Sequence, residues 1–365
     1  MRNLLALALL SLIFMQCKDQ ETCCDLPPVD SIPHYFPPKT GVWATTNADS
    51  MQWNANAIND LYTLLEDNKS RAFLVLQNGK IVLEEYWGKD VLNINNFDAT
   101  KAWYWASAGK TLTGFMLGKA QQEGYLSTND KTNKYLGNGW TSLTQNQEDK
   151  ITIRHQLTMT TGLDDGVANS DATKPSDLLY LADAGTRWAY HNAPYTILDT
   201  VVESATGQLF ESYFNEKLRN QIGMDGQWLW VGNNHVYYST ARSMARFGIL
   251  MQNNGVWENT RLIDSAYLQQ SVTKSQDINH AYGYLWWLNN SNSFMLPGSQ
   301  IKFPGNYAPN APKDMFAALG KNGQFLCIVP SLNLIMIRMG ENPDNSLVPV
   351  LFLDDIWEKL NTILP

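Results

Sequence analysis

Two strand-rich segments near opposite ends of the chain constrain its fold most. The first, RAFLVLQNGKIVLEEYWG, places two β-rich runs around Asn78-Gly79. This pair tolerates positive φ at both central positions of a type I′ turn. The second, FLCIVPSLNLIMIRMG, contains apolar runs at 325–329 and 333–338 on either side of a proline-containing turn. These patterns predict one antiparallel sheet assembled from the two ends of the chain.

The middle of the chain has helical patterns separated by turns rich in Gly, Asn and Asp. Helices are predicted over 107–123, 176–183, 193–205, 208–221 and 240–254, and a last one over about 349–361. The sequence therefore predicts an α+β fold in which an all-helical lobe interrupts a sheet-containing lobe. We expect the α/β lobe at about 41–106 and 270–365, the helical lobe at about 107–269, and a site in the crevice between them.

The first residues resemble a targeting segment. Arg2 precedes an apolar run from Leu4 to Met15, which is shorter than the roughly 20 residues of a membrane span. Residues 1–16 are therefore predicted to be a signal peptide. Cys17 follows directly, which is typical of a bacterial lipoprotein that is cut before this cysteine and acylated on it. The proline-rich residues 17–40 are expected to be a tether, and we expect an exported protein in the periplasm or on the outer membrane.

Composition excludes several other classes of protein. Hydrophobic residues make up 44% of the chain and charged residues 17%, which indicates a globular protein. The net charge is −8 and no basic stripe is present, which argues against a nucleic-acid partner. The four cysteines form no disulfide framework, and Cys327 lies in an apolar run that predicts burial. No Cys/His spacing indicates zinc, so we expect neither a metal nor a cofactor.

A serine and a lysine share one face of the first apolar helix, in WYWASAGKTLTGF. Ser107 and Lys110 are three residues apart, so their Cβ atoms should lie about 5–6 Å apart on a helix. Burial would lower the pKa of Lys110, and the neutral amine could then take the proton of Ser107. The alternative is structural, with a serine cap and a lysine that reaches the solvent. Ser-x-x-Lys recurs at Ser271 and Ser299, but neither begins an apolar helix.

A second motif, Tyr190-His191-Asn192, precedes a helix in a segment of the kind that projects side chains into a cleft. A phenol next to a serine–lysine pair could relay a proton to the leaving group. Asn192 could hold both Lys110 and the substrate. Tyr213-x-Asn215 matches the same pattern, but it lies in the middle of a predicted helix, where packing explains the tyrosine.

The order of these motifs over residues 60–360 resembles the serine β-lactamase-like hydrolases. The similarity is greatest to the class C-type branch, which holds penicillin-binding esterases and 6-aminohexanoate-dimer hydrolase. The resemblance implies a β-lactamase/transpeptidase-like fold and an acyl-enzyme on Ser107. It also implies that Lys110 is the base and Tyr190 the relay acid, although the residues alone leave open which of the two is the resting base.

The third family motif departs from the pattern. Lys-Thr-Gly or His-x-Gly is expected on the strand lining the site, and this chain has FAALGKNGQ, with Ala318-Leu319-Gly320 at that place. Lys321-Asn322-Gly323 is an alternative match shifted by three residues. The first alignment leaves the backbone N–H groups of Ser107 and Lys321, next to Gly320, as the oxyanion hole. It also removes the cation that would bind a β-lactam carboxylate, which argues against classical β-lactamase activity.

The expected function is that of an exported serine hydrolase acting on small esters, amides or short peptides, with membrane contact through Cys17. The alternative is a non-catalytic envelope sensor or peptidoglycan-peptide-binding protein of the same fold. For the remaining polar candidates structural roles are favoured. His155 and His191 could be bases but are expected to be packed side chains, and Asp164-Asp165 is expected to form a turn, although it could polarise a substrate amine. Core packing and pocket lining are equally compatible with a set of aromatic residues, Trp103, Tyr104, Trp105, Trp286 and Trp287.

Overall fold

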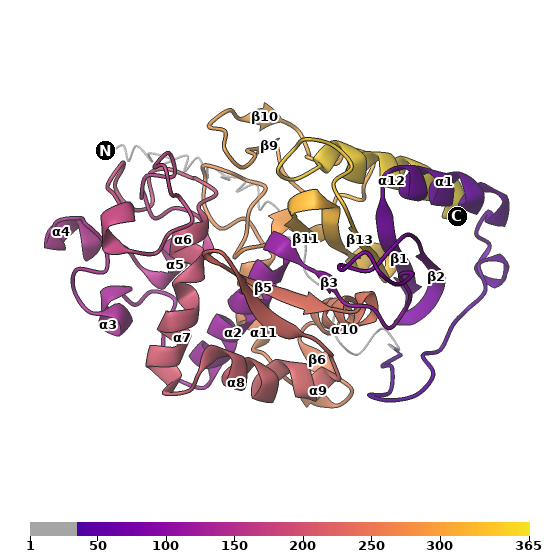
Figure 1. Cartoon of the computed structure of the whole chain (residues 1–365), viewed down its shortest axis with the longest axis horizontal. Coiled ribbons are helices and arrows are strands. Elements are labelled where there is room, and N and C mark those ends of the chain that lie inside the picture. Colours follow the sequence, from indigo (N-terminus) through magenta and orange to yellow (C-terminus); the bar gives the residue numbers. More distant parts are fainter. Residues whose placement is uncertain (1–34) are drawn as a thin grey trace, which may run out of the picture.

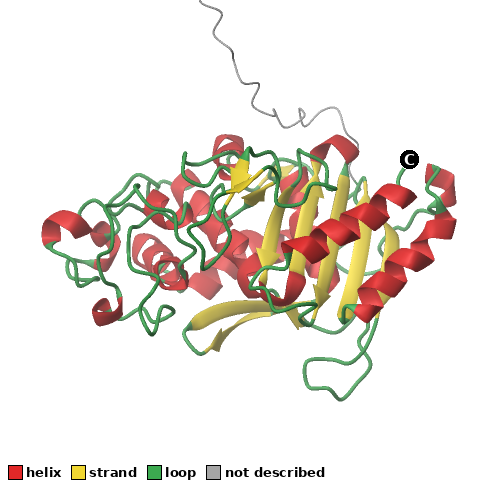
Figure 2. Cartoon of the chain, turned by 90° about the horizontal axis from the view of Figure 1, so that it is seen from above, coloured by secondary structure: helices red, strands yellow, loops and turns green. Residues whose placement is uncertain are grey.

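The computed structural model describes residues 35–365, and a six-stranded sheet forms its centre (Figure 2). The predicted signal peptide and Cys17 lie outside the described residues. Each strand runs antiparallel to its neighbours, in the order β2 (Lys80–Tyr86), β1 (Ser70–Gln77), β13 (Leu334–Gly340), β12 (Gln324–Val329), β11 (Phe316–Gly320) and β8 (Trp287–Leu288). Because β1 pairs with β13, the two ends of the chain are joined in one sheet, as predicted.

Both predicted hairpins are confirmed. Asn78 and Gly79 have φ values of 51° and 79°, the positive values that a type I′ turn requires. At the other end of the chain, β12 and β13 pair around residues 330–332, and Cys327 is fully buried as predicted. Local turn chemistry therefore sets the strand boundaries at both places.

Helices cover the two faces of the sheet (Figures 1 and 2). The terminal helices α1 (Ile58–Asp67) and α12 (Val350–Ile363) pack together on one face, and α10 (Ala241–Gln252) contacts β1, β12 and β13 on the other. Gly248 allows this close approach, because a Cβ there would lie 2.9 Å from side chains of Leu326 and Ile335. The sheet is thus buried on both faces, as its continuous apolar strands indicate.

The helical part of the chain lies beside the sheet (Figure 1). Its central helix is α2 (Lys110–Gln122), which is buried without interruption from Lys110 to Gly118. Shorter helices make up the rest of this region: α3 (Asn133–Leu136), α4 (Gln145–Glu148), α5 (Ile153–Leu157), α6 (Asn192–Thr196), α7 (Leu198–Thr206), α8 (Phe210–Phe214), α9 (Asn220–Ile222) and α11 (Ser265–Ser271). Of these, α7 and α11 contact α2. The helices predicted over 193–205, 208–221 and 240–254 are confirmed, the second with a π turn at Asn215–Arg219.

The helix predicted over 176–183 is wrong. The segment contains a single 3-10 turn, Pro175–Asp177, after which the backbone is extended. The Asp164 amide donates to the Leu179 carbonyl, and the Leu181 amide donates to the Gly162 carbonyl. These long-range backbone hydrogen bonds replace the local ones that a helix would have made.

A second, three-stranded sheet, which was not predicted from the sequence, lies at the edge of the helical region. It consists of β3 (Trp103–Tyr104), β5 (Asn234–Ser239) and β4 (Gln227–Val231). Strand β3 leads directly into the segment that carries Ser107. Two-stranded pairs complete the described fold: β6 (Val256–Trp257) with β7 (Thr260–Arg261), and β9 (Ser293–Phe294) with β10 (Phe303–Pro304). Within residues 35–365 no helix is long and apolar enough to cross a bilayer.

The close packing of α2 against Tyr267 can be tested at Gly118. A Cβ at Gly118 would lie 2.2 Å from the Tyr267 ring, which is buried and donates through its hydroxyl to the Gly114 carbonyl. We expect Gly118→Ala to lower the free energy of unfolding by about 1–3 kcal/mol through overpacking, although alanine is the better helix former by about 1 kcal/mol. Denaturant melts would measure this change, with Gln122→Ala at the exposed end of α2 as the control. A stabilised Gly118→Ala protein would contradict the prediction.

Candidate active site

Ser107 lies in a tight turn between β3 and α2. The 3-10 helix η4 (Ala106–Gly109) runs directly into α2, so Ser107 stands one turn before the helix rather than inside it. Ala106 has φ of 47°, a left-handed backbone conformation that is uncommon for a residue other than glycine. Trp105 fixes the turn from below: its amide donates to the Tyr237 carbonyl, and its indole donates to the Ser239 hydroxyl.

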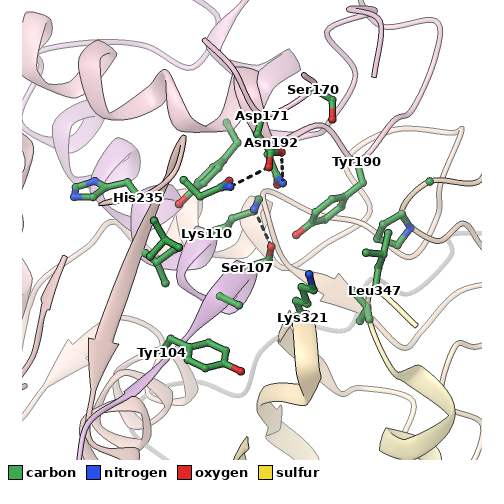
Figure 3. Close-up of a pocket in the computed structure, with 18 of the residues that line it drawn as sticks. Tyr104, Ser107, Lys110, Ser170, Asp171, Tyr190, Asn192, His235, Lys321 and Leu347 are labelled. Carbon is green, nitrogen blue, oxygen red and sulfur yellow. Dashed lines mark hydrogen bonds between the residues drawn. The ribbon is translucent and has the colours of Figure 1, made fainter. Parts of the chain in front are cut away.

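Lys110 is the most buried of the ionisable residues in the pocket that Ser107 lines. Its side chain is 4% exposed, and its Nζ donates to Ser107 Oγ over 2.9 Å (Figure 3). The rings of Tyr195 and Tyr190 flank the amine, with their centres 4.3 and 5.2 Å from Nζ. In the part of the chain that the structure describes, no carboxylate forms an ion pair with Lys110.

This burial changes the chemistry of the amine. Desolvation lowers the pKa of Lys110 from 10.5 to about 7, and the negative charge of Asp171 opposes the shift. A substantial fraction of the amine is therefore neutral near pH 7, with a lone pair within hydrogen-bond distance of the Ser107 hydroxyl. The arrangement can remove the serine proton as the hydroxyl attacks a carbonyl carbon.

Tyr190 faces the same hydroxyl from the opposite wall (Figure 3). Burial raises the pKa of the Tyr190 phenol, and its hydrogen bond with Ser107 partly offsets the rise. The ring stacks on Trp287 at a centroid distance of 6.0 Å, which fixes its orientation. The phenol is therefore protonated at neutral pH and can donate a proton.

Asn192 also lines the pocket, but its amide group donates to Asp171. Asn192 Nδ2 lies 2.9 Å from Asp171 Oδ1, and Asn234 Nδ2 lies 3.0 Å from Asp171 Oδ2. Two amides thus hold the Asp171 carboxylate at the pocket wall (Figure 3). The sequence analysis missed Asp171, because it lies in an irregular loop and its partners are 21 and 63 residues away in the chain.

Gly320 and Lys321 meet the Ser107 turn from the end of β11. A Cβ at Gly320 would lie 2.6 Å from the Trp105 carbonyl oxygen and 2.9 Å from the Ala108 amide nitrogen, so only glycine allows this contact. Lys321 follows in the 3-10 turn η7 (Lys321–Gly323), and its exposed side chain lines the pocket. Ala318 is fully buried in β11 and supplies no charge there.

The pocket has a volume of about 590 Å³ and contains a mixture of polar and aromatic groups. Tyr104 lines it, whereas Trp103, Trp105, Trp286 and Trp287 belong to the core. Of these five aromatic residues, one therefore lines the pocket and four pack in the core.

The remaining candidates have structural surroundings. His155 completes a capping box with Thr152, and His191 is buried with a lowered pKa, chiefly through desolvation. Asp164 Oδ1 accepts from the Gly166 amide in a turn, and Asp165 lines the pocket but pairs with Arg187 at 2.7 Å. Within residues 35–365 no group of acidic, His and Cys residues could hold a metal ion.

One further pair, of which His235 lines the pocket, was not predicted from the sequence. His235 Nδ1 lies 2.7 Å from Asp199 Oδ2, and the Trp230 ring stacks on the imidazole at a centroid distance of 4.5 Å. Since Asp199 belongs to α7 and His235 to β5, this pair fastens the second sheet to the helical region. Its residue types carry no local signal, because the two partners are 36 residues apart.

Comparison with known proteins agrees with this geometry. A family model described as Beta-lactamase matches residues 65–345. The chain belongs to the β-lactamase family. The motif-based resemblance to serine β-lactamase-like hydrolases and the predicted α+β fold of the β-lactamase/transpeptidase type are thereby confirmed.

Relatives and solved structures extend the likeness over most of the chain. An uncharacterized protein of Alkalihalophilus pseudofirmus is 28% identical over 307 residues, which cover 75% of this chain and 84% of that protein. Protein flp of Staphylococcus aureus (strain MW2) is 27% identical over 158 residues, which cover 40% of this chain and 32% of that protein.

Among solved structures, a Bacillus anthracis protein assigned as a 6-aminohexanoate-dimer hydrolase has a TM-score of 0.66 at 19% identity, with 91% of each chain covered. A family VIII carboxylesterase has a TM-score of 0.65 at 14% identity, covering 88% of this chain and 99% of the other. At these identities the structures show a shared fold.

The burial of Lys110 predicts a pH-dependent cost in stability. Its pKa falls from 10.5 in the unfolded chain to about 7, so the unfolded chain binds more protons between these values and stability rises with pH there. Lys110→Met removes the amine but keeps the length of the side chain. We expect it to raise the free energy of unfolding at pH 6 by up to roughly 4 kcal/mol, and by less at pH 10. Denaturant melts at both pH values measure the difference. The prediction would be contradicted if Lys110→Met changed the free energy of unfolding equally at pH 6 and pH 10, or lowered it at pH 6.

Proposed function

We propose that this protein is a serine hydrolase that acylates Ser107 and releases the acyl group to water. The observation that carries the proposal is the buried amine of Lys110, which lies 2.9 Å from Ser107 Oγ and whose pKa desolvation lowers to about 7. Ser107 Oγ attacks the carbonyl carbon of the substrate while its proton passes to Lys110. Tyr190 donates a proton to the leaving alcohol or amine as the bond to the carbonyl carbon breaks. Water then attacks the acyl-enzyme and gives a proton to the Tyr190 phenolate, and Ser107 Oγ regains its proton from Lys110 as the acid leaves.

The backbone N–H groups of Ser107 and Lys321 are the proposed donors to the tetrahedral oxyanion. The close contact at Gly320 supports this assignment, because it brings the turn at 321–323 against the Ser107 turn. Two donors on separate segments then flank one developing charge.

The charges around the pocket favour neutral or amine-bearing substrates. Asp171 presents a fixed carboxylate at the wall, and Ala318 occupies the place where a cation would bind a substrate carboxylate. Lys321 lines the pocket with an ammonium on an exposed side chain, where water screens its charge. We therefore propose small esters, amides or short peptides as substrates, and little hydrolysis of anionic β-lactams.

We also propose that the protein is exported and attached to a membrane. Arg2, the apolar run from Leu4 to Met15 and Cys17 support an exported lipoprotein whose acylated Cys17 attaches it to a membrane. Labelling of cells with a fatty-acid probe, compared between the natural chain and Cys17→Ala, tests the attachment apart from catalysis.

Loss of the nucleophile tests the chemistry. We expect Ser107→Ala to abolish labelling by a fluorophosphonate probe and to reduce p-nitrophenyl ester hydrolysis by at least about 10³-fold, because the proposed acyl-enzyme forms on the Ser107 hydroxyl. Ser271→Ala alters another Ser-x-x-Lys motif, in which the serine donates to the Leu268 carbonyl, and is the matched control. If Ser107→Ala kept both properties, the hydrolase proposal would fail, and a non-catalytic binding protein would replace it.

The position of Asp171 predicts a shift in the pH profile. Its charge raises the pKa of Lys110, so Asp171→Asn should lower that pKa further. We expect the acidic limb of kcat/KM against pH, which should lie near pH 7 in the natural protein, to move to lower pH. Asp165→Asn is the control, because Asp165 also lines the pocket but already pairs with Arg187. A limb that stays in place in Asp171→Asn, or moves equally in Asp165→Asn, would contradict the assignment of Lys110 as the base.

A further inference from the structure

The turn that carries Lys321 has an unusual backbone. Asn322 and Gly323 both lie in the left-handed region, with φ values of 66° and 75°. Such a conformation costs energy at Asn322 and persists only where the surroundings impose it. The contacts that impose it therefore bear on the position of the Lys321 amide, one of the two proposed oxyanion donors.

A buried guanidinium donates hydrogen bonds to the backbone of this turn. Arg338, on β13, is fully buried, and its Nη1 donates to the carbonyl oxygens of Asn322 and Gly323 at 2.5 and 3.1 Å. Its Nε and Nη2 donate to three further oxygens: Ser70 Oγ and the carbonyls of Asn68 and Glu341. A Cβ at Gly323 would lie 2.7 Å from Arg338 Nη1, so glycine is needed at this position for the guanidinium to fit.

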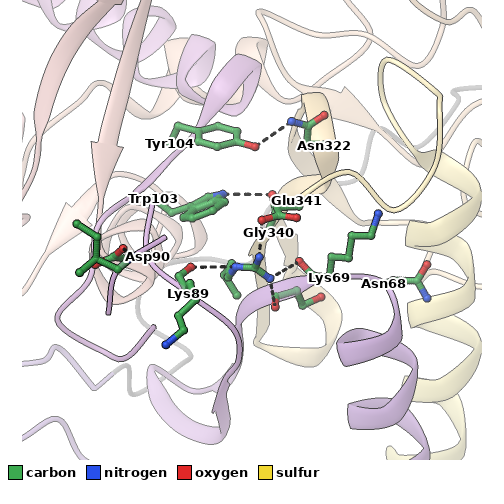
Figure 4. A network of polar contacts seen from close by, with 12 residues as sticks. Asn68, Lys69, Lys89, Asp90, Trp103, Tyr104, Asn322, Gly340 and Glu341 are labelled. Carbon is green, nitrogen blue, oxygen red and sulfur yellow. Dashed lines mark hydrogen bonds and ion pairs between the residues drawn. The ribbon is translucent and has the colours of Figure 1, made fainter. Parts of the chain in front are cut away.

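A side-chain hydrogen bond ties the same turn to the segment that carries the nucleophile. Asn322 Nδ2 donates to Tyr104 Oη over 2.8 Å (Figure 4). Tyr104 lies in β3, three residues before Ser107. Its neighbour Trp103 donates through its indole to the Gly340 carbonyl at the end of β13, at 3.2 Å. The two segments that carry the proposed oxyanion donors, the Ser107 turn and the turn at 321–323, are thus both attached to the Gly340 end of β13.

We propose that the Asn322–Tyr104 hydrogen bond is a clamp that sets the spacing between the Ser107 and Lys321 amides. Asn322 and Tyr104 are then positioning residues, and the inference rests on the proposed acyl-transfer function. Because the amides bind the oxyanion more strongly than the ground-state carbonyl, the clamp acts mainly on kcat and hardly on KM.

Two substitutions test the clamp without disturbing the buried guanidinium. Asn322→Gly keeps access to the left-handed backbone and removes the donor; Tyr104→Phe removes the acceptor. With a p-nitrophenyl ester, each is expected to lower kcat about tenfold, with KM changed less than twofold. The double variant should lose no more than either single variant, because one interaction is removed in all three.

A substrate comparison separates positioning from general damage. The matching thionoester develops charge on sulfur, which accepts N–H hydrogen bonds weakly, so its kcat should change less than twofold in both variants. Asn333→Gly is the matched control: Asn333 also has a left-handed φ, of 48°, but lies at the opposite end of β13. Equal losses with both substrates, or losses as large in Asn333→Gly, would overturn the clamp.

Failure of the clamp can be distinguished from failure of the proposed hydrolase function by comparing these variants with Ser107→Ala. Full oxoester kcat in Asn322→Gly and Tyr104→Phe, together with an inactive Ser107→Ala, would overturn the clamp and leave the hydrolase intact. Undiminished hydrolysis in Ser107→Ala would overturn both.

Discussion

An amine buried without a counter-ion is the constraint on which the rest of the site depends. In the described residues, the Lys110 amine has one hydrogen-bond partner, Ser107, and two aromatic rings for walls. Desolvation therefore dominates its proton affinity. Asp171 is near enough to raise that affinity, yet two asparagine amides hold its oxygens. The separation of this carboxylate from the amine thus limits how far it raises the pKa of Lys110. A direct ion pair would have kept the amine protonated.

The fold delivers the reacting groups to one place by joining the chain ends. Ser107 and Lys110 follow from the start of the helical region, whereas Lys321 comes from the sheet edge more than 200 residues later. Antiparallel pairing of β11 with β12, and of β12 with β13, places the end of β11 beside the Ser107 turn. Gly320 makes the final approach possible, since any side chain there would collide with the Trp105 carbonyl.

Sequence patterns predicted the features that depend on local geometry. Asn78-Gly79 predicted a hairpin because its turn type needs positive φ at both central positions. The Ser107–Lys110 spacing was readable because consecutive helical turns bring such residues together. Asp171 was not, since its place depends on a loop and on partners far along the chain. The helix predicted at 176–183 failed for the same reason: distant backbone groups at 162–164 outcompeted a local amphipathic pattern.

Two buried cations show how the intrinsic pKa of a basic side chain decides its charge after burial. Arg338 and Lys110 are both excluded from water, and burial lowers the pKa of each. Five oxygens surround the planar guanidinium, which holds the turn at 321–323. Burial lowers its pKa from 12.5 to about 9, so it is still charged at neutral pH. Burial lowers the pKa of Lys110 by a similar amount, but from 10.5, so that it reaches about 7. The same burial that makes one cation a structural anchor makes the other a base.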